Sequence, residues 1–150
     1  LRHEVERAGQ LSVVECRLVL EPGVPERVLI DPDATAEAIS NLLDNARRHA
    51  LTIVGVRVYT RSGQLLIEVF DDGPGLPAGA EEQAFERFVT LDGRGGTGLG
   101  LSIAREISQR QGGDLSYRHK AFVLTLPLNP PARAQGVAGS GGKKARLPAS

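Results

Sequence analysis

A row of polar side chains in residues 34–50 has the spacing of one helix face. Asn41 and Asn45 are four residues apart, which stacks their amides one turn apart, and Arg48 continues the row. Amide oxygens suit a Mg²⁺ ion that keeps several waters, and a guanidinium suits phosphate oxygens. A solvated face of an amphipathic helix has the same spacing, so this row alone leaves both interpretations open.

Two glycine-rich segments add a second kind of chemistry. Residues 71–75 have the sequence Asp-Asp-Gly-Pro-Gly directly after an apolar run. A flat ligand can approach the backbone there, and a carboxylate can accept a hydrogen bond from an exocyclic amine such as that of adenine. An ordinary surface turn uses the same residue types, so both interpretations stay open. Residues 95–101 bring several glycines into a helix start, which aims backbone N–H groups at a phosphate.

The second glycine-rich segment differs from two common nucleotide motifs. No Lys-Ser or Lys-Thr pair follows it, as a P-loop requires. No first strand of a βαβ unit leads into it, as a dinucleotide-binding fingerprint requires. A dinucleotide-dependent oxidoreductase is therefore disfavoured.

The elements that must position these residues follow from hydrophobic periodicity. Alternating apolar and polar residues predict six strands, at 12–20, 27–30, 52–60, 64–70, 115–117 and 122–128. Helical spacing predicts three helices, at 34–50 after an acidic cap, at 80–88, and from Thr97 to about Arg110. We expect residues 1–10 to be the end of a helix or linker and 11–129 to be one domain. The tail, 130–150, is rich in Ala, Gly, Ser and Pro and is expected to be disordered.

The distribution of charge limits the partners. Residues 129–150 carry four basic and no acidic side chains, so the remainder holds 14 basic and 18 acidic ones, a net charge of −4. An acidic body argues against nucleic acid as the main ligand. No apolar run approaches the ~20 residues that span a bilayer, and neither a signal peptide nor an initiator Met is present. We therefore expect a fragment of a longer protein, and the single cysteine, Cys16, is compatible with a reducing, cytoplasmic setting.

Four segments, in this order, resemble the sequence boxes of sensor histidine kinases. Residues 41–50 resemble the N box, 71–77 the G1 box, 85–88 the F box and 96–101 the G2 box. The resemblance covers roughly residues 12–128. It implies the α+β Bergerat ATP-binding fold shared with gyrase, heat-shock chaperone and mismatch-repair ATPases. That fold is a two-layer sandwich, in which about three helices cover one face of a mixed, mostly antiparallel sheet.

The resemblance also implies a role for each matching residue. Asn45 matches the Mg²⁺ ligand, Asn41 the neighbouring polar position near the phosphates, and Arg48 the basic phosphate contact, so these three are the implied catalytic residues. Asp71 matches the acid that binds the adenine amine. The other nucleotide contacts implied are His49, Gly73, Gly75, Leu76, Gly96, Thr97, Gly98, Leu99, Gly100, Leu101 and Thr125, with Phe85 and Phe88 anchoring the mobile lid.

The implied reaction moves the γ-phosphoryl group of ATP to a histidine on a separate dimerisation domain of a membrane-anchored parent kinase, with a response regulator downstream. The isolated domain is expected to be monomeric.

The acceptor histidine is expected outside this chain. His3-Glu4 is the only pair that resembles the start of the family's acceptor box, and residues 5–9 do not continue as that box does. ATPases of this fold have a Glu at position 41 that activates water. An amide cannot accept that proton, so Asn41 favours phosphotransfer.

Two alternatives stay open. A serine kinase of the anti-sigma-factor type shares the fold and the boxes, and a regulatory module could bind nucleotide without catalysis, although the intact Asn45 and Asp71 count against the latter. The sequence also departs from the family in two places. The hairpin at 117–122 lacks the glycine-rich turn that is frequent there, and the lid between Pro77 and Gly95 is short.

Overall fold

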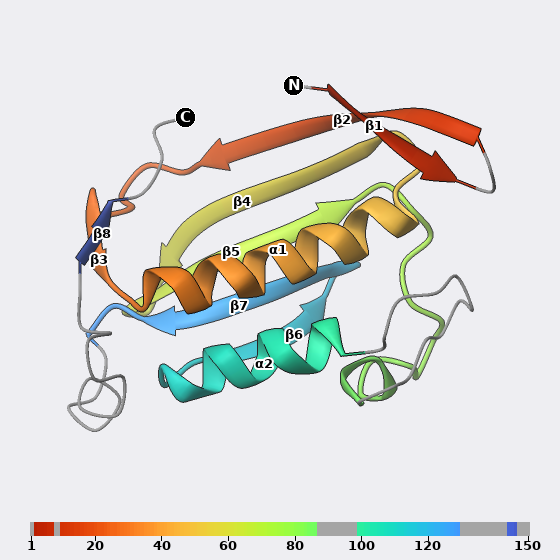
Figure 1. Ribbon diagram of the computed structural model, residues 1–150. Coiled ribbons are helices and arrows are strands. Elements are labelled where there is room, and N and C mark those ends of the chain that lie inside the picture. Colours follow the sequence, from red (N-terminus) through yellow and green to blue (C-terminus); the bar gives the residue numbers. More distant parts are fainter. Residues whose placement is uncertain (1, 8–9, 87–98, 130–143, 147–150) are drawn as a thin grey trace.

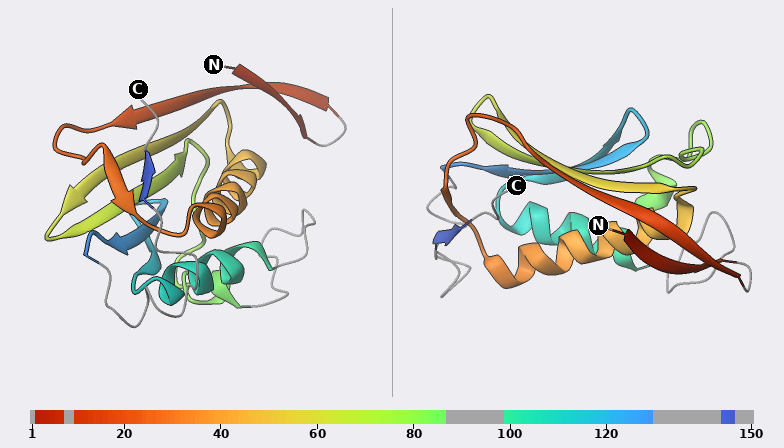
Figure 2. Two further views of the ribbon diagram at one scale, coloured as in Figure 1. Left: turned by 60° about the vertical axis from the view of Figure 1, so that its left-hand side comes forward. Right: turned by 90° about the horizontal axis from the view of Figure 1, so that it is seen from above.

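The computed structural model describes residues 2–7, 10–86, 99–129 and 144–146. One large sheet forms one layer, and both α-helices of the described residues, α1 (Pro32–His49) and α2 (Gly100–Arg110), pack on a single face of it (Figures 1 and 2). The apolar core lies between these two layers, with Leu42 of α1 and Leu115 and Leu124 of the sheet fully buried. The α+β two-layer sandwich is therefore confirmed.

The large sheet has six strands in the order β1-β2-β4-β5-β7-β6. Their bounds are Arg2–Arg7 for β1, Gln10–Leu20 for β2, Ile53–Arg61 for β4, Gln64–Asp71 for β5, Asp114–Arg118 for β6 and Ala121–Pro127 for β7. Only β2 and β4 pair in parallel, and the other neighbours are antiparallel. A separate two-stranded sheet joins β3 (Arg27–Leu29) to β8 (Lys144–Arg146).

Helix α1 begins where the acidic cap predicted it. The Asp31 carboxylate accepts a hydrogen bond from the Ala34 N–H at 3.0 Å, and Pro32 occupies the first turn, where its missing N–H costs nothing. Leu42 and Ala46 are buried against the sheet. Removing a buried Leu side chain of this kind costs about 2–5 kcal/mol, so this face holds the helix in place.

Two tight hairpins set the register of the central strands. Ser62 and Gly63 join β4 to β5, and His119 and Lys120 join β6 to β7, all four with positive φ. Two successive positive φ values are the geometry whose twist matches antiparallel strands. The turn at His119 and Lys120 reaches this geometry without glycine, at positions where other residues are uncommon.

Several predicted elements differ in the structure. Residues 2–7 form strand β1, not the end of a helix, because they pair with β2, and pairing overrides a weak local pattern. The expected helix at 80–88 is reduced to one 3₁₀ turn, η1 (Gln83–Phe85), and residues 87–98 lie outside the described part. Helix α2 starts at Gly100 without a side-chain cap.

The prediction that residues 130–150 are disordered is also corrected in part. Residues 144–146 pair with β3 as strand β8, whereas 130–143 and 147–150 lie outside the described residues. Of the three predicted helices, the one at 80–88 is therefore not an α-helix in the described part of the chain, which holds two α-helices and η1. Neither α-helix there combines the length and the hydropathy that crossing a bilayer needs.

The loop between α1 and β4 is held by one carboxylate. Asp72 accepts hydrogen bonds from the N–H groups of Leu51, Thr52 and Ile53 at 2.8, 2.9 and 3.0 Å, and from the Thr52 hydroxyl at 2.5 Å. Burial raises the pKa of Asp72, but these hydrogen bonds together outweigh it and hold the pKa well below its usual value. Asp72 thus ties the loop between α1 and β4 to the segment after β5.

Replacing the Asp72 carboxylate tests how much it stabilises the loop between α1 and β4. Asp72→Asn keeps one acceptor oxygen but loses the charge, so we expect the free energy of unfolding at pH 7 to fall by about 1 kcal/mol, a low figure because the group is exposed. Since the folded-state pKa is lowered, the carboxylate stabilises the fold above its ordinary pKa of 3.8, and this contribution is lost as the pH falls through the folded-state pKa. Urea denaturation should show the two proteins converging below about pH 4.

A surface carboxylate provides the control. Asp44 pairs with Arg47 at 3.2 Å on the exposed side of α1, so Asp44→Asn should change the free energy of unfolding by less than about 0.5 kcal/mol. Equal effects of the two substitutions at pH 7 would rule out the anchoring role of Asp72.

Candidate functional site

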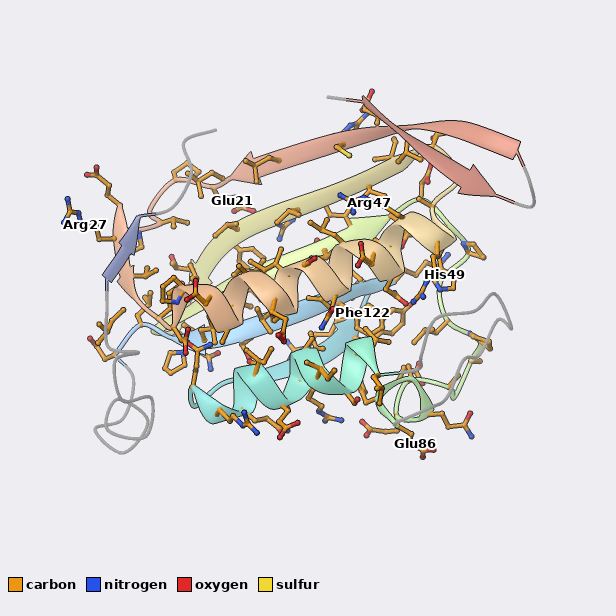
Figure 3. The ribbon with its side chains drawn as sticks, in the orientation of Figure 1. Glu21, Arg27, Arg47, His49, Glu86 and Phe122 are labelled. Atoms are coloured by element: carbon orange, nitrogen blue, oxygen red, sulfur yellow. The ribbon has the colours of Figure 1, made fainter. Side chains whose placement is uncertain are left out.

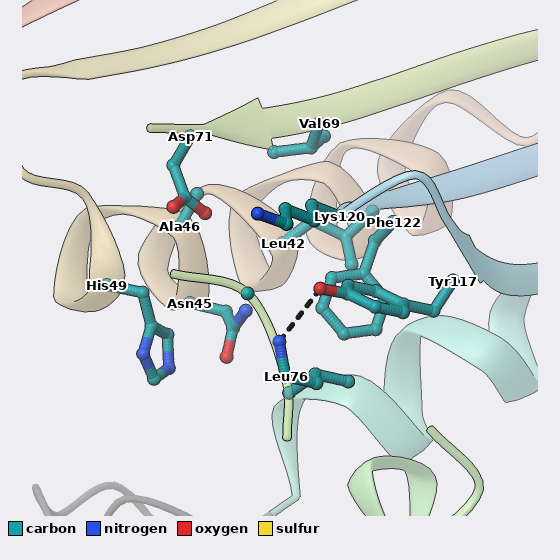
Figure 4. Close-up of a pocket in the computed structure, with 11 residues that line it drawn as sticks. Leu42, Asn45, Ala46, His49, Val69, Asp71, Leu76, Tyr117, Lys120 and Phe122 are labelled. Atoms are coloured by element: carbon teal, nitrogen blue, oxygen red, sulfur yellow. Dashed lines mark hydrogen bonds between the residues drawn. The ribbon is translucent and has the colours of Figure 1, made fainter. Parts of the chain in front are cut away.

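A cavity of about 370 Å³, partly continuous with solvent, lies between the second half of α1, the end of β5 and the β6–β7 hairpin (Figure 4). Five of the residues implied as nucleotide contacts line it together: Asn45, His49, Asp71, Gly75 and Leu76. In Figure 3, His49 lies at the C-terminal end of α1 and Phe122 lies between the two helices.

Two elements carry the polar side of this cavity. Helix α1 places Asn45 and His49 one turn apart on the side that borders the cavity, while Leu42 and Ala46 turn their apolar side chains toward its floor. Strand β5 ends at Asp71, whose Oδ1 accepts a hydrogen bond from the Gly73 N–H at 2.7 Å. Thus a carboxylate and an amide from segments far apart in the chain face one space.

The two glycines after Asp71 permit close packing that no other residue allows. A Cβ on Gly73 would lie 2.1 Å from the His49 carbonyl oxygen. Gly75 has a φ of 81°, and a Cβ there would lie 2.8 Å from the Tyr117 hydroxyl. The loop is therefore pressed against the end of α1 on one side and against the β6–β7 hairpin on the other.

Aromatic rings build the apolar side of the cavity. Tyr117 and Phe122 pack at a centroid distance of 4.9 Å, and Phe122 meets Phe85 edge-to-face at 5.8 Å. The Arg105 guanidinium lies over the Phe85 ring, 4.5 Å from its centroid. Phe85 of the F-box segment is thus a core residue beside the cavity, and Phe88 lies outside the described residues.

The phosphate-side candidates are only partly described. Gly100 opens α2 next to Asn41, whose Cβ would be 3.7 Å from a Cβ on Gly100. Leu99 and Leu101 are half-buried, and Leu101 packs against the core. Arg48 is exposed near the end of α1. Neither Asn41 nor Arg48 lines the cavity itself, and Gly96, Thr97 and Gly98 lie outside the described residues.

Thr125, another implied contact, does not line the cavity. Its hydroxyl donates to the Asp114 carbonyl oxygen at 3.0 Å and accepts from the Asp114 N–H at 3.2 Å, so it joins β7 to β6. It stands three residues beyond Phe122 on β7, roughly 10 Å along the strand. A contact of Thr125 with the nucleotide therefore stays a prediction.

Six cavity residues were not among the sequence candidates. They are the apolar Leu42, Ala46, Val69 and Phe122, and the polar Tyr117 and Lys120. The buried face of α1 and the alternation of β5 could have indicated Leu42 and Val69, because both belong to predicted core faces. Nothing local could have indicated Tyr117 and Lys120, since they reach the cavity only through the pairing of β6 with β7.

The arrangement could hold a nucleotide with a divalent cation. In the described residues no group of three or more His, Cys, Asp or Glu side chains gathers at one point, so a metal here would depend on few protein ligands. Mg²⁺ is commonly held in this way, by one or two side chains together with phosphate oxygens and water. The Asn45 amide, which borders the cavity one turn from Asn41, fits that requirement.

Comparison with known proteins gives consistent matches. The sequence profile of the family described as "Histidine kinase-, DNA gyrase B-, and HSP90-like ATPase" matches residues 30–130. The probable sensor histidine kinase TcrY of Mycobacterium tuberculosis is 36% identical over an alignment of 118 residues, and the match covers 70% of this chain and 25% of TcrY. The sensor histidine kinase WalK of Bacillus subtilis is 35% identical over an alignment of 120 residues, and the match covers 70% of this chain and 20% of WalK.

Solved structures agree with the sequence matches. The mycobacterial sensor histidine kinase MprB superposes with a TM-score of 0.66 at 30% identity, covering 79% of this chain and 84% of that one. Full-length ShkA in complex with AMPPNP has a TM-score of 0.70 at 25% identity, covering 79% of this chain and 26% of ShkA. The chain spans about a quarter or less of the length of the curated relatives named above.

Substituting Gly73 tests the packing of the loop after Asp71. Gly73→Ala forces a methyl group against the His49 carbonyl, so the loop must shift; we expect a loss of about 1–3 kcal/mol in unfolding free energy and about tenfold weaker nucleotide binding. Gly79→Ala is the control, because Gly79 has a φ of 79° but open space around it. It should lose only about 1 kcal/mol from backbone strain and keep its affinity. Equal affinities in the two variants, measured by titration calorimetry, would contradict this packing.

Proposed function

Because this chain belongs to the family of histidine kinase-, DNA gyrase B- and HSP90-like ATPases and is a catalytic domain of the sensor histidine kinase type, we propose that it binds Mg²⁺-ATP in the cavity and transfers the γ-phosphoryl group to a histidine on a separate dimerisation domain. A response regulator is the proposed downstream partner. We also propose that residues 11–129 are the functional unit, monomeric when isolated and cytoplasmic in a membrane-anchored parent.

One observation carries the proposal. The cavity brings Asn45 of α1 to the same space as Asp71 and the turn at Gly75 and Leu76, although these segments are separate in the sequence. An adenine ring needs an acceptor for its amine and apolar surfaces above and below it, and Asp71 with Val69 and Phe122 offers both. The ShkA complex with AMPPNP supports an adenine nucleotide as the ligand class.

The other end of the nucleotide is proposed to lie along the polar row of α1. Asn45 would hold Mg²⁺, Asn41 would lie near the phosphates beside the start of α2 at Gly100, and Arg48 would contact phosphate from the exposed end of the row. A bound Mg²⁺ neutralises phosphate charge during phosphoryl transfer. The protein residues supply position and electrostatic support, and the histidine of the partner domain supplies the nucleophile.

Position 41 favours phosphotransfer over hydrolysis. An amide cannot take a proton from water at neutral pH, so Asn41 cannot act as the base that a Glu would be. The relatives reported above carry sensor-kinase names, which leaves the serine-kinase alternative without support. A phospho-acceptor histidine of this family would lie on a helix, whereas His3 lies in strand β1 and pairs with Val14 of β2. The acceptor is therefore proposed to lie outside this chain.

Removing the amide of Asn45 tests the proposed metal contact. We expect Asn45→Ala to lose the Mg²⁺-dependent part of ATP affinity, about tenfold or more, because few protein ligands hold the ion. ATP affinity in excess chelator should match that of the wild type. Titration calorimetry with and without Mg²⁺ makes the comparison, and Asn129→Ala, exposed beyond β7, is the control. A variant that keeps the full Mg²⁺ effect would remove Asn45 from the metal site.

Label transfer tests the reaction itself. We expect this chain, incubated with γ-labelled ATP and a histidine-bearing dimerisation domain from a sensor kinase, to place acid-labile label on that domain. The chain alone should acquire no label, and the Asn45→Ala variant should be strongly impaired. Acid-stable label on a serine, or ATP hydrolysis without any transfer, would refute the proposed reaction.

A further inference from the structure

We propose that the β6–β7 hairpin contributes two nucleotide-pocket residues that lie outside all four sequence boxes: Tyr117 as a positioning residue for the loop after Asp71, and Lys120 as a cationic contact for the base. The proposal rests on the proposed function, because it assigns these residues to the base end of the same cavity. It is carried by a hydrogen bond, a ring contact and two close approaches.

Tyr117 ties the hairpin to the loop after Asp71. The Leu76 N–H donates to the Tyr117 hydroxyl oxygen at 2.8 Å, across 41 residues of sequence (Figure 4). The ring is half-buried and packs on Phe122, so the hydroxyl has little freedom to move away. A backbone donor held in this way fixes both Leu76 and Gly75, and these two residues line the cavity beside Asp71.

Lys120 reaches the same cavity because the turn is so short. His119 and Lys120 alone join β6 to β7, with φ values of 51° and 64°. The Lys120 stem then passes Gly75 closely: its Cγ would be 3.1 Å from a Cβ placed there. In Figure 4 the Lys120 side chain extends into the cavity that Asp71 also lines. A longer glycine-rich turn would carry no such side chain at this place.

The two charged groups complement the edge of adenine. A lysine ammonium can only donate hydrogen bonds and a carboxylate can only accept them. Adenine offers an amino donor beside a ring-nitrogen acceptor, whereas guanine has a carbonyl oxygen where adenine has its amine. Asp71 can therefore accept from the adenine amine while Lys120 donates to the adjacent nitrogen. Facing a guanine, Asp71 would meet an oxygen and repel it.

The first experiment removes only the Tyr117 hydroxyl. In the full 150-residue chain, Tyr117→Phe keeps the ring on Phe122 but leaves the Leu76 N–H without its acceptor. We expect adenosine, ADP and ATP all to bind about fivefold more weakly, because the loss is at the base end. In phosphotransfer to a histidine domain, KM for ATP should rise by the same factor with kcat unchanged. Tyr59→Phe, beneath Arg57 and Arg61 and outside the cavity lining, should change neither.

The second experiment removes the Lys120 charge at nearly constant length. We expect Lys120→Met to fold like the wild type, because the Lys120 side chain is exposed at a turn. We expect about fivefold weaker binding of adenosine, ADP and ATP alike, and a smaller preference for ATP over GTP. Arg118→Met on the same hairpin is the control. A loss that grows with the number of phosphates would overturn the assignment of Lys120 to the base.

The outcomes separate this proposal from the proposed function. If the wild-type chain binds no adenine nucleotide, the proposed function fails. If the wild type binds ATP and both Tyr117→Phe and Lys120→Met bind it equally well, the hairpin assignment fails while the proposed function stands. Weaker binding by both variants, with their controls unchanged, supports the assignment.

Discussion

The structure of the site depends on a short loop after β5 that is held from both sides. Asp72 ties it to the start of β4 through three backbone N–H groups, and Tyr117 ties it to the β6–β7 hairpin through the Leu76 N–H. Gly73 lets the loop touch the His49 carbonyl. These contacts place Asp71 and leave little freedom for the cavity wall, which is what a preformed binding site requires.

Helix α1 serves the core and the cavity at the same time. Its Leu42 and Ala46 are buried, and Asn45, between them in sequence, borders the cavity. The burial that holds the helix against the sheet therefore also fixes the polar row that begins at Asn41. The aromatic contacts of Phe122 with Phe85 and Tyr117 continue the same layer, so the apolar wall of the cavity is an extension of the hydrophobic core.

Much of the fold could be predicted because its patterns are local. The cap at Asp31, the spacing of α1, the turn at Ser62 and Gly63 and the end of β5 at Asp71 follow from neighbours in sequence, and the structure has all of them. Strands β1 and β8 could not be found in this way. Each is stabilised by pairing with a partner strand, β2 or β3, and local composition says little about such pairing.

The sequence by itself determined the chemistry of the site: two amides at helical spacing, a carboxylate at a strand end and glycines that make room. Only the tertiary structure decided which side chains surround them. Tyr117 and Lys120 line the cavity because β6 and β7 pair through a two-residue turn, whereas Thr125, farther along β7, bonds to Asp114 instead. Residue types reveal the groups available, but sheet register decides which of them meet, because it joins segments that no local pattern connects.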